Sequence, residues 1–341
     1  MQRKMVPKLS ASIPSSAVVI GLGTVATVAA SYAVYQHVVN RAKFKKLGTV
    51  KRLFIYPIKS LPPIELTRAY VTVHGMTYKD LRDREFMLIN PMDGNKSVSA
   101  REEPRLLLLH VNYNEEAKCL EITSKDPMVP TGTLVLSLEP VTVDWNSPDQ
   151  LDIFIRKPEH AYKCLPIAEA SAWFSKYLGK DFKFVRFLRQ TVKRRKEIPD
   201  RFYDLAELNI LSEKSVENLN ELICDPSTDV SYRNFRPSIL LDVNMPFEED
   251  YWAIMKIGDL ETEFLQRCVR CVLITINPDT GVKTDKEPLT TLRKYRIDRS
   301  EEGIAKYRRQ PLFSANHVIR RPGKIYVGQS IEAIRAPREM L

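Results

Sequence analysis

The body of the chain is a series of short runs rich in β-branched and aromatic residues, separated by turn-forming residues such as Pro91-Met92-Asp93-Gly94-Asn95. Runs of this kind predict strands bounded by tight turns. They recur roughly every 10–15 residues, a spacing that favours a β-barrel or a β-sandwich. In the first half we expect strands at Val50–Tyr56, Ala69–Val73, Glu85–Ile89, Leu106–Asn112, Cys119–Thr123, Thr133–Leu138, Val141–Trp145, Leu151–Arg156 and Phe182–Phe187.

A few segments change to the period of a helix. Apolar residues recur at helical spacing from Ile167 to Leu178, and Gly179 follows as a stop. Ser212 occupies an N-cap position before a helix that reaches about Leu222, and Pro288–Tyr295 predicts a third. The predicted fold class is therefore mixed α+β and β-rich. The strands expected in this half are Ile239–Val243, Trp252–Ile257, Glu261–Leu265, Cys271–Ile276 and Lys324–Val327.

The N-terminus carries a long segment without Asp, Glu, Lys or Arg, from Leu9 to Asn40. Its centre, Ala17–Tyr35, would span about 28 Å as a helix, close to the thickness of a bilayer core. We expect one retained transmembrane signal-anchor at about 17–35; a cleaved signal peptide and a mitochondrial presequence are the alternatives. The basic residues that follow favour a cytosolic body, and a weakly apolar anchor suits the thin mitochondrial outer membrane.

Charge and cysteine use exclude two classes of protein. The net charge is +10, yet residues 1–60 hold ten basic side chains and no acidic one, so the rest is balanced. A balanced body argues against nucleic-acid binding. Five cysteines in no regular framework argue against a secreted disulfide scaffold and favour a reducing environment.

Four segments each place a basic residue beside an expected strand end, where the loops of a barrel gather. Arginine and lysine there suit a phosphate-bearing ligand, and they would favour the thiolate form of a nearby cysteine. Cys271 is the candidate thiol, although a buried strand thiol is the alternative interpretation. The segments are Tyr56-Pro57-Ile58-Lys59-Ser60, Leu81-Arg82-Asp83-Arg84, Asn234-Phe235-Arg236-Pro237 and Arg267-Cys268-Val269-Arg270-Cys271, which continues to Asn277-Pro278-Asp279-Thr280-Gly281.

These segments occur in this order and are followed by Lys286–Arg296. With this order of segments the chain resembles the MOSC-domain molybdenum enzymes, above all the mitochondrial amidoxime-reducing components. The resemblance covers about residues 48–339. It implies a signal-anchor and basic linker at 1–47, an N-terminal MOSC β-barrel region at 48–182, and a MOSC-domain β-barrel with flanking helices at 183–341. It also implies that the Cys271 thiolate binds molybdenum, and that the molybdenum cofactor (Mo-molybdopterin) is held by Lys59, Ser60, Arg84, Arg236 and Arg270.

The chain departs from the family at several positions near these segments. Ser238 stands where relatives have Asn, and Asn316 stands at an aromatic position; we expect both to contact the cofactor. Leu205 and Ala206 replace small hydroxyl residues, and Val269 replaces a serine. These changes affect individual polar contacts more than cofactor binding itself.

The resemblance implies a reductase that converts N-hydroxylated compounds, namely amidoximes, N-hydroxyguanidines and hydroxylamines, to amidines or amines. The chain has no credible flavin, NAD or haem motif, so the resemblance further implies cytochrome b5 and its NADH-dependent reductase as electron donors. Two alternatives stay open: sulfur transfer through a Cys271 persulfide, and a membrane-tethered carrier of the cofactor. We expect a monomer.

Overall fold

The computed structural model describes residues 43–124, 132–141, 150–154, 161–190, 203, 205–225, 228, 230–284 and 286–335. The expected transmembrane segment at 17–35 lies outside these residues and stays a prediction. Within them, no helix is long and apolar enough to cross a bilayer.

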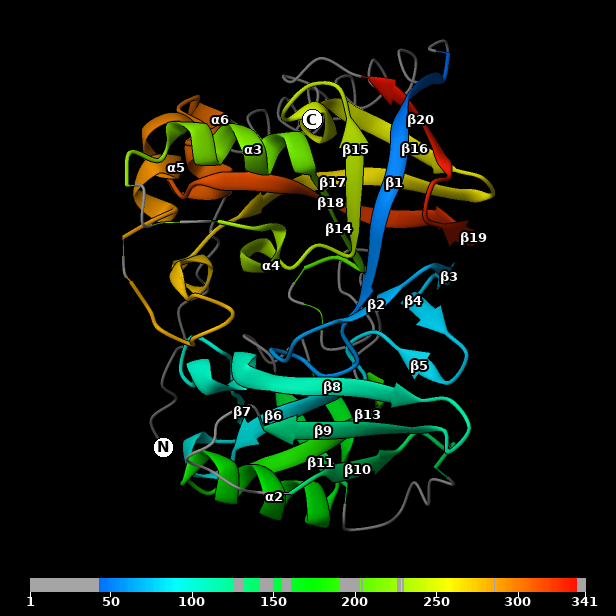
Figure 1. Ribbon diagram of the computed structural model, residues 1–341, viewed down its shortest axis with the longest axis vertical. Coiled ribbons are helices and arrows are strands. Elements are labelled where there is room, and N and C mark those ends of the chain that lie inside the picture. The colour runs from blue at the N-terminus through cyan, green and yellow to red at the C-terminus, as the bar shows by residue number, and fades with distance from the viewer. Residues whose placement is uncertain are drawn as a thin grey trace, which may run out of the picture.

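The larger lobe is built on one sheet, which is the upper part of Figure 1. An extra pairing between β1 and β15 closes it into a barrel, and β2 is attached outside the ring along β1. The strand pairs are antiparallel except β14 with β15. In order the strands are β15 (Ile239–Val243), β14 (Leu208–Ser212), β18 (Leu312–Arg321), β17 (Leu260–Val269), β16 (Trp252–Ile257), β20 (Ser330–Arg335), β1 (Lys45–Ile55) and β2 (Ile64–Leu66).

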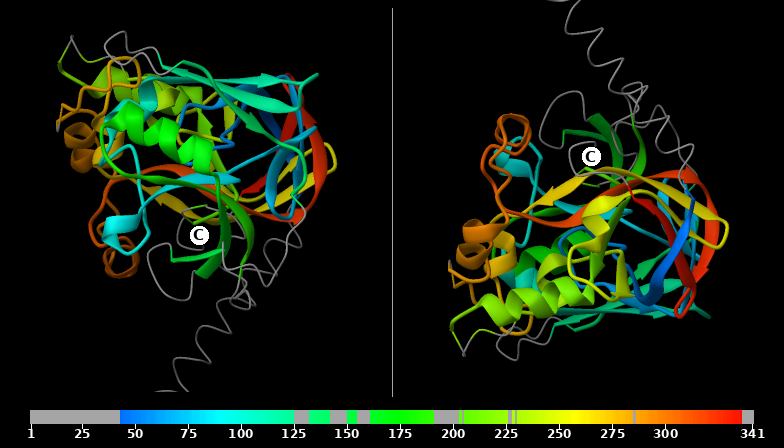
Figure 2. Two further views of the ribbon diagram at one scale, coloured as in Figure 1. Left: turned by 90° about the horizontal axis from the view of Figure 1, so that it is seen from below. Right: turned by 90° about the horizontal axis from the view of Figure 1, so that it is seen from above.

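Helices lie on one side of this barrel, as the view from above in Figure 2 shows. They cover an apolar cluster that includes Leu211 on β14, Leu240 on β15 and Phe313 on β18. The alternate residues of the same strands, among them Ile210 and Ile239, belong to the main core. The elements of this side are α3 (Glu213–Leu222), α4 (Tyr232–Phe235), α5 (Leu289–Tyr295), α6 (Glu301–Tyr307) and the 3₁₀ helices η3 (Glu248–Tyr251) and η4 (Val272–Thr275).

The smaller lobe holds three further sheets and helix α2 (Ala168–Leu178), with the 3₁₀ helices η1 (Pro91–Asp93) and η2 (Pro104–Leu108). One sheet is β11 (Leu151–Phe154), β12 (Ala161–Pro166), β13 (Lys183–Gln190), β6 (Phe86–Asn90) and β7 (Lys96–Ser97). Another is β10 (Leu134–Ser137), β9 (Cys119–Ser124) and β8 (Leu109–Asn114). The last is β19 (Gly323–Tyr326), β3 (Arg68–Thr72), β4 (Gly75–Tyr78) and β5 (Leu81–Arg82).

The sheets cross the expected domain boundary at 182/183 in both directions. Strand β1 comes from the first half of the chain but pairs with β15 and β20 in the larger sheet. Strand β13 comes after residue 182 but pairs with β6 and β12 in the smaller lobe. Strand β19 likewise pairs with β3. The two lobes therefore share strands, and the chain passes between them more than once.

Local signals predicted the helices well. Helix α2 ends at Leu178, and Gly179 adopts the left-handed conformation (φ 70°) that glycine permits. The Ser212 hydroxyl accepts a hydrogen bond of 3.1 Å from the Ser215 backbone N–H, as an N-cap should. The β-rich class is confirmed, with a closed barrel sheet and few helices among the described residues.

Two expected strands are wrong in whole or in part. Cys271–Ile276 is not a strand: it contains η4, in which the Ile274 N–H donates to the Cys271 carbonyl (3.2 Å). The chain leaves the sheet after Val269 and packs Ile274 into the apolar cluster, so burial overrides the β propensity of the residues. Leu106–Asn112 begins as η2, and its strand starts only at Leu109.

Closure of the barrel requires a glycine at position 48. Gly48 faces Val243 on β15, and a Cβ atom there would collide with the carbonyl oxygen of Asp242. Backbone cannot yield as a flexible side chain can, so overpacking at this point is costly.

We expect Gly48→Ala to lower the free energy of unfolding by about 2–3 kcal/mol, because β1 and β15 would be forced apart. Lys46→Ala is the control: Lys46 is exposed on the same strand, and its loss should cost less than about 0.5 kcal/mol. Urea unfolding of both variants measures this. Equal stabilities of Gly48→Ala and Lys46→Ala would show that the close approach is not required.

Candidate functional site

The loop after β1 and the turn before β6 are joined backbone to backbone. The Arg84 N–H donates to the Tyr56 carbonyl (2.8 Å), and the Lys59 N–H donates to the Phe86 carbonyl (2.8 Å). In the other direction, the Phe86 N–H donates a hydrogen bond to the Pro57 carbonyl (3.0 Å). The first two predicted segments therefore form one unit, which brings Lys59 and Arg84 into the same neighbourhood.

Tyr56 is the buried centre of this unit. The guanidinium carbons of Arg84 and Arg236 lie 4.3 and 4.5 Å from the centre of its ring. Its hydroxyl donates to the Pro237 carbonyl (3.0 Å), and burial raises its pKa to about 12 although both arginines lower it. Tyr56 therefore stays a neutral hydrogen-bond donor that holds the Arg236 segment beside Arg84.

Two of the cations of this unit, Arg84 and Arg236, lie against the same tyrosine ring. Lys59 is buried, the side chain of Arg84 is 16% exposed, and Arg236 donates to the Leu61 carbonyl (2.7 Å). The Asp83 carboxylate lies 3.3 Å from Arg84 and accepts from the Tyr56 N–H, so it partly compensates the charge. An anionic ligand would stabilise such a cluster.

Four non-glycine residues of the predicted segments and their surroundings adopt left-handed backbone conformations. Their φ angles are 72° at Ser60, 55° at Arg84, 55° at Arg236 and 72° at Ser314. Each costs of order 1–3 kcal/mol and persists only where the surrounding structure fixes it. The site is therefore built on strained positions that set the direction of its side chains.

A second group of predicted residues surrounds Arg270. Its Nε donates to the Phe313 carbonyl (2.8 Å) and its Nη1 to the Phe235 carbonyl (3.0 Å). Its Nη2 contacts the Ser314 hydroxyl and lies 3.4 Å from the Asn209 side-chain oxygen. Arg270 is thus a buried brace that joins β18 to the segment carrying Arg236.

Asn209 was missed by the sequence analysis. Its amide nitrogen donates to the Asn316 side-chain oxygen (3.0 Å), and its backbone N–H lies 3.3 Å from the Ser238 hydroxyl. Asn209 therefore brings the departing residues together with Arg270: its backbone contacts Ser238, and its side chain contacts Asn316 and Arg270. The available signal was a single amide between Leu208 and Ile210, too short a pattern to identify.

The segment from Phe235 to Ser238 joins the two groups. Phe235 accepts from Arg270, Arg236 lies against Tyr56, and Pro237 accepts from the Tyr56 hydroxyl. The Ser238 carbonyl accepts from the Phe54 N–H on β1 (2.9 Å). Six of the predicted cofactor-binding residues therefore lie along one connected network, and Ser60 follows one of them directly in the chain; the six are Lys59, Arg84, Arg236, Ser238, Arg270 and Asn316.

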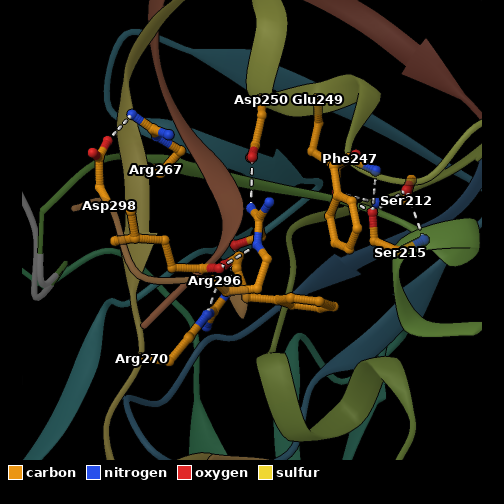
Figure 3. A network of polar contacts seen from close by, with 12 residues as sticks. Ser212, Ser215, Phe247, Glu249, Asp250, Arg267, Arg270, Arg296 and Asp298 are labelled. Atoms are coloured by element: carbon orange, nitrogen blue, oxygen red, sulfur yellow. Dashed lines mark hydrogen bonds and ion pairs between the residues drawn. The ribbon is translucent and has the colours of Figure 1, made fainter. Parts of the chain in front are cut away.

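A buried ionic network supports the start of β18, as Figure 3 shows. Arg296 donates to Asp250 (2.5 Å) and to the Leu312 carbonyl (2.8 Å), one residue before the carbonyl that Arg270 grips. Glu249 precedes Asp250 in the chain, and its burial and the Asp250 carboxylate raise the pKa of Glu249 to about 6. Two arginines thus fix consecutive carbonyls of one strand.

Cys271 follows directly on Arg270 and is half-buried, as is Cys268. The Arg270 N–H donates to the Pro311 carbonyl (2.8 Å), which fixes the backbone just before the thiol. Asn234 donates its amide to the Ile274 carbonyl (3.1 Å), so α4 and the turn after Cys271 are also tied. The accessible thiol therefore sits on a chain segment fixed on both sides.

Comparison with known proteins agrees with this arrangement. A MOSC N-terminal beta barrel domain matches residues 47–181, and a MOSC domain matches residues 201–332. The chain is 32% identical over 303 residues to mitochondrial amidoxime reducing component 2 of Bos taurus, which covers 86% of this chain and 85% of the bovine protein. It is 34% identical over 305 residues to mitochondrial amidoxime-reducing component 1 of Homo sapiens, with the same coverage of each chain.

The chain belongs to the MOSC-domain family of amidoxime-reducing components. In this member of the family, buried cations, amide and hydroxyl groups and one accessible thiol lie along a single network. Such a donor set can hold a phosphate-bearing anion and offer a sulfur ligand to a metal.

Proposed function

We propose that the protein is a molybdenum-cofactor-dependent reductase of N-hydroxylated compounds. The observation that carries the proposal is the half-buried Cys271 directly after Arg270, in a network that joins Arg84, Arg236 and Tyr56. Family membership supports a reductase of the molybdenum type. Amidoximes, N-hydroxyguanidines and hydroxylamines are the proposed substrates, with amidines or amines as products.

The residues present fit the proposed cofactor. Its phosphate needs cations and hydrogen-bond donors, which Lys59, Ser60, Arg84 and Arg236 would supply. Its metal takes soft sulfur ligands, and Cys271 would supply one thiolate. The rest of the cofactor would be held by Arg270, Ser238 and Asn316, the residues that contact Asn209.

The protein groups bind and orient, while the redox chemistry belongs to the cofactor. The bound cofactor would supply the two electrons which, with two protons, remove the oxygen of an N-hydroxylated substrate as water. The left-handed positions at Ser60, Arg84 and Arg236 would fix the cationic side chains before the ligand arrives, which lowers the cost of binding.

The electron supply and location are parts of the same proposal. Electrons would come from cytochrome b5 and its NADH-dependent reductase. The N-terminal segment at 17–35 would anchor the protein in the mitochondrial outer membrane, with the body facing the cytosol. The mitochondrial names of the relatives support this location.

We expect Cys271→Ser to reduce N-hydroxylated-substrate turnover to background, because a hydroxyl cannot replace the soft thiolate. Cys268→Ser is the matched control, since that thiol is also half-buried and stands three residues away. It should keep most of the activity. The assay is amidoxime reduction with an artificial electron donor. Equal loss in both variants would indicate a dithiol mechanism and contradict the assignment.

We expect Arg236→Ala to weaken cofactor retention about 10- to 150-fold, because a charge-assisted hydrogen bond contributes about 1.5–3 kcal/mol to binding. Arg233→Ala is the control from α4, the short helix that ends just before Arg236; Arg233 pairs with Asp279 at the surface (2.7 Å). Molybdenum content after gel filtration measures retention, and the thermal midpoint reports folding. Full molybdenum in Arg236→Ala would place this arginine outside the cofactor site.

A further inference from the structure

Asn209 occupies the meeting point of three strands next to the proposed cofactor site. It lies on β14 directly opposite Asn316 on β18. On its other side its carbonyl accepts from the Ser238 N–H (2.7 Å) at the start of β15. Residues directly opposite each other on neighbouring strands share a face of the sheet, so these polar side chains form a row.

The amide of Asn209 uses both of its ends. Its nitrogen donates to the Ser314 hydroxyl (2.8 Å) and to the Asn316 oxygen (3.0 Å), while its oxygen lies 3.4 Å from Arg270 Nη2. A carboxylate could face Arg270 but could not donate to Asn316, and an aliphatic side chain could do neither. The position therefore uses the specific chemistry of an amide.

Arg270 Nη2 completes its contacts through Asn209 and Ser314, and the Ser314 hydroxyl is the nearer of the two. Arg270 Nε and Nη1 donate to the Phe313 and Phe235 carbonyls. Among the described residues, the hydrogen-bond partners of Nη2 are Asn209 and Ser314. The Asn209 amide supports both partners of Nη2, because it also exchanges hydrogen bonds with the Ser314 hydroxyl (2.8 and 3.1 Å). It also fixes the side-chain oxygen of Asn316 (3.0 Å).

The fold itself does not need an amide at this position. The next residue of β14 on the same face is Leu211, which belongs to the apolar cluster with Leu240 and Phe313. The backbone pairing at 209 would accept a leucine, which would continue that apolar pattern, whereas the hydrogen bonds to Ser314, Asn316 and Arg270 need an amide. The amide is therefore better explained by the site than by the sheet.

We propose that Asn209 is a positioning residue of the cofactor site, which orients Arg270 and Asn316 toward the bound cofactor. This inference rests on the proposed function. It assigns a role to a residue whose own side chain is uncharged, and it predicts that the cofactor is lost before the fold is.

The test compares the full-length wild-type protein with Asn209→Leu, Asn209→Asp and Asn220→Leu, each produced in a host that makes molybdenum cofactor. Asn220 is the matched control, since its amide bridges the Val230 backbone (2.7 and 3.2 Å) at the end of α3. Molybdenum per chain after gel filtration and the thermal midpoint are measured for each. We expect both Asn209 variants to lose cofactor about tenfold faster than wild type, with midpoints no lower than that of Asn220→Leu.

The outcomes separate the two claims. Wild-type protein with molybdenum, together with Asn209 variants that retain it as well as Asn220→Leu does, overturns the positioning role and leaves the proposed function standing. Asn209→Leu that loses molybdenum only in proportion to a lowered midpoint also overturns it, and Asn209→Asp, which keeps the shape of the side chain, provides the second test. Wild-type protein without molybdenum overturns the proposed function and this inference with it.

Discussion

Pairing of β1 with both β20 and β15 is the constraint on which the rest of the structure depends. It closes the larger barrel with a strand from the start of the described chain, and Gly48 permits the close approach. The same strand ends at Ile55, so closure delivers the Tyr56–Ser60 loop to the side where Arg236 lies. Closure of the barrel therefore also brings the parts of the cationic site together.

The site is held mainly through backbone carbonyls. Arg270 donates hydrogen bonds to the Phe313 and Phe235 carbonyls. Arg296 donates to the Leu312 carbonyl, and the Tyr56 hydroxyl donates to the Pro237 carbonyl. Contacts of this kind do not depend on the identity of the residue that offers the carbonyl. They also hold like charges close together in advance, at a cost that an anionic ligand would offset.

The sequence predicted what depends on local signals. The cap at Ser212, the stop at Gly179 and most strands follow from residue type and period, and the four basic segments marked the site. The sequence does not predict η4, because the residue types of Cys271–Ile276 favour a strand and only the packing against α4 and α5 favours the 3₁₀ helix. It missed the strands at Leu312–Arg321 and Leu208–Ser212, where polar residues interrupt the pattern, and with them Asn209. Pairing across more than a hundred residues decides those positions.

The most direct test of the account is metal analysis of the purified full-length protein after gel filtration, combined with an assay for labile sulfur. A cationic network that ends in an accessible Cys271 predicts stoichiometric molybdenum that stays with the chain. A protein that carries labile sulfur on Cys271 and no molybdenum would contradict the account, because the thiol would then serve sulfur transfer.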